Sequence, residues 1–142
     1  MFNTKPQRVA ALQNTAIFGG LPKSDIASIE RHSTQMTVTA GTEMAVQDRA
    51  PLQMFVIASG TAVVKRNNRK IASLGAGDTV GELSLLDGGK QTATVIAHTD
   101  CEVLVVAVNE FKIMLDESPT FTRKLLKSLA MRLREADKGL GV

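Results

Sequence analysis

Apolar residues follow a helical spacing at both ends of the chain and a two-residue alternation in between. At the start, the spacing predicts a short, broken helix ending at Gly19-Gly20 and a second short helix opening at Leu21-Pro22. The apolar positions of these two helices are Val9, Leu12, Ile17, Phe18, Ile26, Ala27 and Ile29. Residues 1–33 are therefore expected to form an N-terminal helical segment.

The middle of the chain, residues 34–108, has the alternation that is typical of β-strands. Turn signals divide it into about eight short strands. Their expected ranges are 34–39, 43–46, 53–58, 61–65, 70–74, a strand ending at 81, 91–97 and 101–108. Between two of them, Asn67-Asn68 predicts a tight hairpin turn, because Asn tolerates positive φ. Many short strands at this spacing favour a sandwich or a closed barrel.

Helical spacing returns over residues 109–138. Asn109 is expected to cap a helix over residues 110–115. Ser118-Pro119 should start a final helix that reaches Lys138 and ends at Gly139. Its apolar positions, three and four residues apart, are Phe121, Leu125, Leu126, Leu129 and Leu133. We therefore expect residues 1–142 to form one domain that is mainly β with flanking helices.

Composition says more about the cellular compartment of the protein than about its function. The single cysteine, Cys101, excludes an internal disulfide, and the longest apolar run, 103–108, is too short to cross a bilayer. Both features fit a cytoplasmic protein. The net charge is +3, with an excess of basic residues over 123–138. We interpret this excess as a solvated helix face rather than a nucleic-acid contact, because no aromatic residues are interleaved with it.

No arrangement of residues predicts catalysis. His32 and His98 lie in different elements and form no metal-binding pattern, and Cys101 lacks a basic neighbour that would activate its thiol. A buried strand thiol is the simpler interpretation of Cys101. We therefore expect no enzyme active site and no bound metal.

The segment from Gly77 to Thr94 carries the clearest chemical signal. A strand ends at Gly81, one helical turn follows over 82–86, and a glycine-rich loop leads into the next strand. A helix start exposes backbone N–H groups that attract an anion, and glycine lets a ligand approach the backbone. Glu82 beside such an anion could accept a hydrogen bond from a sugar hydroxyl. The pattern indicates a pocket for a small phosphate ester, although an ordinary turn would look the same.

The stretch Val80-Gly81-Glu82-Leu83-Ser84-Leu85-Leu86 resembles the phosphate-binding cassette of the cyclic-nucleotide-binding domains, the type found in the catabolite activator protein and in protein kinase A regulatory subunits. Other matches to the family pattern occur in the same order along the chain. They are 17–21, 39–42, 59–61, Gly77-Asp78 and 94–97. The resemblance covers roughly Ala11 to Leu133 and implies an eight-stranded antiparallel β-roll.

The resemblance also implies a ligand, cAMP or cGMP, and a set of contacts. Glu82 would accept the ribose 2′-hydroxyl, and backbone amides near Leu83, Ser84 and Thr92 would hold the cyclic phosphate. The final helix, residues 119–138, would close over the base, and in dimeric members it pairs with its twin. The expected binding residues are Gly81, Glu82, Leu83, Ser84, Lys90, Gln91, Thr92 and Ala93.

The chain departs from the family at the position of the phosphate-binding arginine, which is Gln91 here. A neutral amide replaces a charge-assisted guanidinium contact, a loss of about 1.5–3 kcal/mol. Lys90 is the neighbouring cation that could turn toward the phosphate, and Thr92 could add a hydroxyl contact to either purine. Asp48 stands where many members have glycine, and Asp tolerates the left-handed conformation.

Two functions follow from these features. One is a stand-alone cyclic-nucleotide receptor that signals to an unknown partner protein through its final helix. The other is an interaction or dimerisation protein that has lost useful nucleotide binding, which Gln91 favours. Family regulators that read DNA carry a helix-turn-helix after the long helix, and the sequence stops at Val142. If that is the whole protein, we expect no direct DNA binding.

Overall fold

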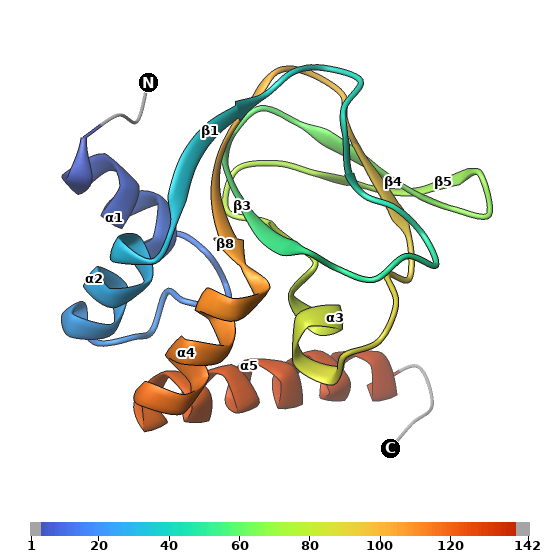
Figure 1. Ribbon diagram of the computed structural model, residues 1–142. Coiled ribbons are helices and arrows are strands. Elements are labelled where there is room, and N and C mark those ends of the chain that lie inside the picture. Colours follow the sequence, from blue (N-terminus) through green and yellow to red (C-terminus); the bar gives the residue numbers. More distant parts are fainter. Residues whose placement is uncertain (1–3, 139–142) are drawn as a thin grey trace.

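The computed structural model describes residues 4–138, apart from the side chains of Glu82, Leu83, Leu85 and Arg132. It contains a β-roll with helices packed against one side (Figure 1). The helices are α1 (Lys5–Gln13), α2 (Lys23–Arg31), α3 (Glu82–Asp87), α4 (Val108–Glu117) and α5 (Pro119–Asp137). The strands are β1 (Thr34–Val38), β2 (Glu43–Ala45), β3 (Gln53–Ser59), β4 (Ala62–Arg66), β5 (Arg69–Leu74), β6 (Thr79–Val80), β7 (Thr94–Ala97) and β8 (Cys101–Ala107).

The eight strands form two antiparallel sheets of four, which confirms the expected β-roll. One sheet has the order β1-β8-β3-β6 and the other β2-β7-β4-β5. Their inner faces share a hydrophobic core that includes Phe55, Ile57, Val95 and Val103. Helix α3 joins β6, at the edge of the first sheet, to β7 in the second. The predicted phosphate-binding segment therefore lies where the chain passes from one sheet to the other.

Strands β3 and β8 are buried on both faces, which explains why their sequences are nearly continuous apolar runs. In β3, Phe55 and Ile57 face the interior of the roll, whereas Met54 and Val56 face the helices. The same alternation continues in β8. A strand that is half exposed would instead alternate apolar with polar residues.

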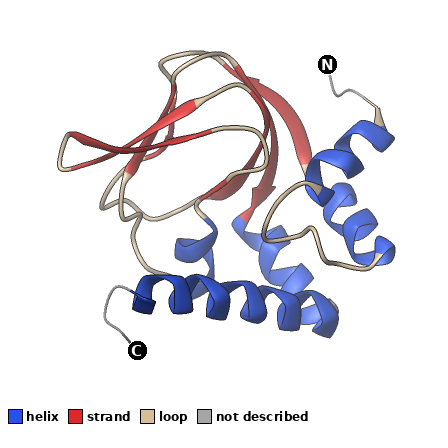
Figure 2. Cartoon of the chain, turned by 180° about the vertical axis from the view of Figure 1, so that it is seen from behind, coloured by secondary structure: helices blue, strands red, loops and turns tan. Residues whose placement is uncertain are grey.

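A helical layer covers the outer face of the sheet that contains β3 and β8 (Figure 2). Its centre is Phe121 of α5, whose ring lies 5.6 Å from that of Phe18 and 5.9 Å from that of Phe111 in α4. The Oγ atom of Ser118 accepts a hydrogen bond from the Phe121 backbone N–H at 3.1 Å, so the predicted Ser118-Pro119 start of the final helix is confirmed. Gly139 lies outside the described residues.

Two helix boundaries differ from the prediction. Helix α1 ends at Gln13 instead of Gly19-Gly20, because the Thr15 hydroxyl bonds to the carbonyl of Leu12 and to the N–H of Phe18 and folds the chain into turns. Helix α4 begins at Val108 with Ala107 at its cap position, so Asn109 is not the cap. The Val108 N–H donates instead to Leu52 O at 3.1 Å. Contacts with distant segments, rather than the local cap signal, fix where α4 begins.

Strand β7 begins at Thr94, three residues later than predicted, because the backbone at Gln91 pairs with a loop. Two turn predictions are confirmed. Asn67 and Asn68 have φ angles of 51° and 65°, and Asp48 has a φ of 67°. Cys101 is a buried strand thiol, and burial raises its pKa. Among the helices of residues 4–138, none is both long and apolar enough to cross a membrane.

Candidate functional site

Helix α3 begins and ends at glycines in the left-handed conformation. Gly81, before the helix, has a φ of 93°, and Gly88, after it, has a φ of 70°. A Cβ at position 81 would lie 3.1 Å from Gln53 O of β3 and 3.4 Å from Gln91 Nε2. Gly81 is thus required by its own conformation and by close protein neighbours. It sets the direction in which the first turn of α3 points.

A buried hydrogen bond joins the start and the end of the segment. Ser84 and Gln91 are 5% and 8% exposed, and the Ser84 hydroxyl donates to Gln91 Oε1 at 3.3 Å. The same hydroxyl lies 3.3 Å from the carbonyl oxygen of Lys90. The Gln91 side chain is therefore turned toward Ser84 and Gly81 and held in the interior.

The loop between β2 and β3 fixes the backbone of Gln91. The Gln91 N–H donates to Arg49 O at 2.8 Å, and the Gln91 carbonyl accepts from the Asp48 N–H at 2.9 Å. Arg49, Gln53, Phe55 and Gln91 are among the residues around an adjacent cavity of about 240 Å³. The left-handed conformation at Asp48 allows this pairing, which removes residues 91–93 from the β-ladder.

The β4–β5 hairpin holds the other side of the segment. Arg66 Nε donates to Thr92 O at 3.1 Å. Thr94 Oγ1 accepts from the Gln47 N–H at 3.0 Å, and the Gln47 side chain exchanges two 2.8 Å hydrogen bonds with Asn67. Residues 91–94 are consequently fixed from both flanks before any ligand is present.

The structure brings together some of the predicted site residues. The Gln91 side chain lies close to both Gly81 and Ser84, and Ala93 is buried. The side chains of Lys90 and Thr92 are exposed. Glu82 and Leu83 belong to the first turn of α3, but their side chains lie outside the described part of the chain. Among the described residues, no group of three metal-ligating side chains lies together.

Sequence reasoning missed Arg66, the only described side chain found to donate a hydrogen bond to the backbone of residues 91–93. The stretch Arg66-Asn67-Asn68-Arg69 indicated a turn and nothing more. The alternation along β4 could have identified Arg66. It lies two and four residues after Val64 and Ala62, which pack in the interior of the roll, so all three share one face of the strand.

The site combines a weak anion-binding backbone with a neutral buried amide. Because glycine precedes α3, no side chain caps its first turn, and the first N–H groups of a helix have no intrahelical partner. Gln91 adds hydrogen-bonding capacity without charge. The arrangement can hold a small anionic group through neutral donors, with a guanidinium at its margin.

Comparison with known proteins assigns the fold and the family. Residues 24–118 match the family model of the cyclic nucleotide-binding domain. The cyclic AMP receptor protein of Thermus thermophilus is 28% identical over 131 residues, which are 89% of this chain and 61% of that protein. The chain therefore spans less than two thirds of that relative's length.

Solved structures agree with this result. The catabolite activator protein of Thermus thermophilus superposes with a TM-score of 0.78 at 28% identity, over 89% of this chain and 62% of that one. The N-terminal domain of a transcriptional regulator from Streptomyces coelicolor A3(2) also gives a TM-score of 0.78, at 23% identity, over 92% and 94% of the two chains. With the family model matching well over half of its residues, the chain belongs to the cyclic nucleotide-binding domain family.

Proposed function

We propose that this chain binds cAMP or cGMP and transmits the bound state through α5. The observation that carries the proposal is the segment from Gly81 to Ala93, which joins the two sheets and whose sequence resembles the family's phosphate-binding cassette. The relative from Thermus thermophilus is, by its name, a cyclic AMP receptor. The segment is preorganised by its glycines and by hydrogen bonds from both flanks, which lowers the entropy lost on binding.

The proposed contacts follow the cassette residue by residue. Glu82 accepts the ribose 2′-hydroxyl, and the backbone N–H groups of Leu83, Ser84 and Thr92 hold the cyclic phosphate. Gly81 and Ala93, at the two ends of the segment, present no large side chain to the ligand. Gln91 can donate one neutral amide N–H to the phosphate, since its oxygen is bonded to Ser84. Affinity should therefore be weaker than with arginine at position 91.

The route to the final helix passes through α3. Leu86 of α3 and Leu129 of α5 pack against the same helical core, and Figure 1 shows α3 directly beside α5. A ligand that shifts the first turn of α3 would change this packing. The hinge for α5 is Ser118, which is extended, with φ −125° and ψ 94°, between α4 and α5. Ligand binding would then select between positions of α5.

A second function is favoured by one observation, the buried Ser84–Gln91 hydrogen bond. Because this contact satisfies the hydrogen-bonding capacity of the Gln91 amide oxygen, the segment needs no ligand to keep its conformation. The β-roll and α5 would then act in dimerisation or in docking a partner protein, with no useful nucleotide affinity.

Titration with cAMP and cGMP separates the two functions. We expect weak but measurable binding by calorimetry, and ligand at 100 times its Kd should raise the free energy of unfolding by about 2.7 kcal/mol. Gln91→Arg should strengthen binding about tenfold or more, because it restores a charge-assisted contact. Glu82→Ala should weaken binding if the carboxylate accepts the ribose hydroxyl.

The control ligand is AMP, which has the same base and lacks the cyclic ester. A receptor of the proposed kind prefers the cyclic nucleotide. If neither cyclic nucleotide shifts the unfolding transition of the wild type or of Gln91→Arg, the result rejects nucleotide binding and favours the interaction function.

A further inference from the structure

On the β4–β5 hairpin, the two arginines lie on one face and the two lysines on the other. Along β4, Ala62 and Val64 pack in the interior of the roll, and the pairing with β7 continues without interruption to Lys65. Because side chains alternate along a strand, Arg66 lies on the same face as Ala62 and Val64, with its side chain exposed at the end of the strand, and Lys65 lies on the opposite face. Residues directly opposite in an antiparallel pair share a face, so Arg69 lies with Arg66 and Lys70 with Lys65.

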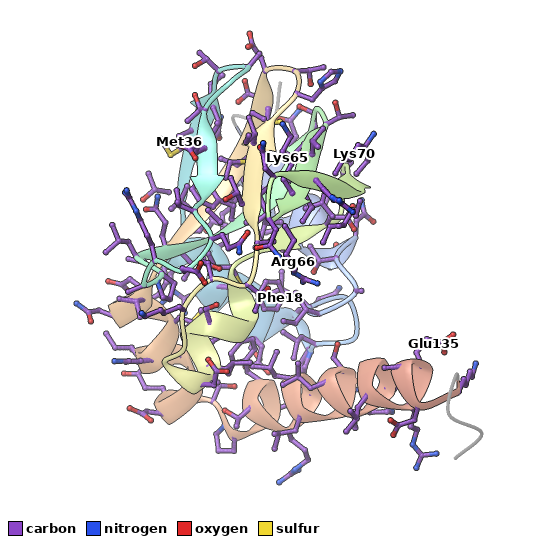
Figure 3. All side chains as sticks on the ribbon, turned by 90° about the vertical axis from the view of Figure 1, so that its right-hand side faces the viewer. Phe18, Met36, Lys65, Arg66, Lys70 and Glu135 are labelled. Atoms are coloured by element: carbon purple, nitrogen blue, oxygen red, sulfur yellow. The ribbon has the colours of Figure 1, made fainter. Side chains whose placement is uncertain are left out.

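Figure 3 agrees with this arrangement. Lys65 and Lys70 are labelled on one side of the hairpin, and Arg66 is labelled on the other side, toward α3 and α5. An extra residue in β5, Ile71, interrupts the pairing with β4 between Ala72 and Lys70. The bulge lies in β5, so it does not change the face on which Arg66 lies.

Arg66 is anchored to the cassette with part of its guanidinium still available. Its Nε donates to Thr92 O at 3.1 Å, and among the described side chains and backbone no hydrogen bond or ion pair is found for its two terminal nitrogens. The anchor places the guanidinium beside the backbone of Thr92, which also carries an N–H group. That N–H is one of the donors assigned above to the cyclic phosphate.

The repulsion between the charges of Arg66 and Arg69 argues against a purely structural role for the pair. Like charges directly opposite each other on one face of an antiparallel pair are destabilising, and the sequence from 62 to 74 contains no Asp or Glu that could offset them. A bound anion between the two guanidinium groups would remove this repulsion. Guanidinium also suits phosphate better than ammonium does, because its planar fork can donate two parallel hydrogen bonds.

We infer that Arg66, with Arg69 opposite it, supplies the guanidinium contact to the ligand's phosphate that residue 91 no longer provides. This inference rests on the proposed binding of a cyclic nucleotide. In this arrangement, the positive charge that contacts the phosphate comes from a strand of the second sheet and not from the cassette itself. It also assigns Lys90, whose side chain is exposed, no necessary role.

Calorimetric titration of three variants of the 142-residue chain tests the inference. Arg66→Gln should lower the affinity for cAMP and cGMP about 10- to 100-fold, and Arg69→Gln should lower it less. Lys65→Gln is the matched control, because it removes the same charge one residue away on the outer face. It should change the affinity by less than about twofold. Equal affinities of the wild type and Arg66→Gln would overturn the inference and leave the proposed function intact.

A second measurement applies if the wild type binds neither nucleotide, a result that rejects the proposed function. Inorganic phosphate is then titrated into the ¹⁵N-labelled chain, with NMR detection of the Arg66 Nε–H and the Thr92 amide. Saturating shifts at both groups that disappear in Arg66→Gln and persist in Lys65→Gln support an anion site at Arg66. Shifts that do not saturate, or that are the same in Arg66→Gln, overturn it.

Discussion

At the scale of single residues, Gly81 and Gly41 have nearly the same conformation in different surroundings. Their φ angles are 93° and 91°, but a Cβ at 41 would meet no atom within 4 Å, whereas one at 81 would lie 3.1 Å from Gln53 O. Gly41→Ala should lower the free energy of unfolding by about 1–2 kcal/mol from backbone strain. Gly81→Ala should lower it by about 1–3 kcal/mol more from crowding.

Urea unfolding of the two variants measures this difference directly. Equal losses would mean that β3 moves away without cost and that the position of α3 is not fixed by the contact with Gln53. The comparison isolates crowding, since both variants share the left-handed strain.

Residue patterns in the sequence were enough to locate the cassette, but they did not identify the basic residue that lies beside it. Glycines, the Asn-Asn turn and Asp48 follow local conformational rules, and these were predicted correctly. Arg66 and Thr92 come together through pairing between β4 and β7, which are about 30 residues apart. A basic residue in a turn gives no sign of which face it occupies until the strand register is known.

At the scale of elements, Ser118 links the start of α5 to α2. Its hydroxyl accepts from the Phe121 N–H and donates to Asp25 Oδ1 at 2.8 Å, while Asp25 Oδ2 is buried without a partner among the described residues. Ser118→Ala should lower the free energy of unfolding by about 1–2 kcal/mol, because it removes a helix cap and a bond to a partly buried carboxylate.

The control for this prediction is Thr120→Ala, an exposed change in the first turn of the same helix, which should cost less than about 0.5 kcal/mol. Thermal unfolding at fixed pH measures both variants. If the two lose the same stability, the cap and the bond to Asp25 make no net contribution.

Elements with strong internal patterns were predicted well, and boundaries set by distant contacts were not. The apolar runs of β3 and β8 and the spacing of α5 reflect burial of the element itself. The starts of α4 and β7 depend instead on Leu52, Asp48 and Arg49, residues of a loop whose position is known only after the sheets form. A local signal such as Asn109 is overridden when the backbone has a long-range partner.

At the scale of the molecule, the apolar residues of α5 fall into two sets. Phe121 and Leu125 are 2% exposed and complete the helical core, but Leu126 and Leu133 are 62% and 64% exposed. These two are seven residues apart, close to two helical turns, and therefore lie on one flank. In Figures 1 and 2, no other described element covers the outer side of α5. An exposed apolar flank with this spacing is typical of helix pairing.

We therefore predict that α5 pairs with α5 of a second copy and that the chain is a dimer in solution. Light scattering after gel filtration should give twice the chain mass of 15.2 kDa. Leu126→Glu combined with Leu133→Glu should give the monomer mass, because it introduces charge at the centre of the pair. Met131→Glu is the control, since Met131 is equally exposed at 62% but lies on the opposite flank, where it lines a cavity together with Ile17. A single-chain mass for the wild type at every concentration would contradict the pairing.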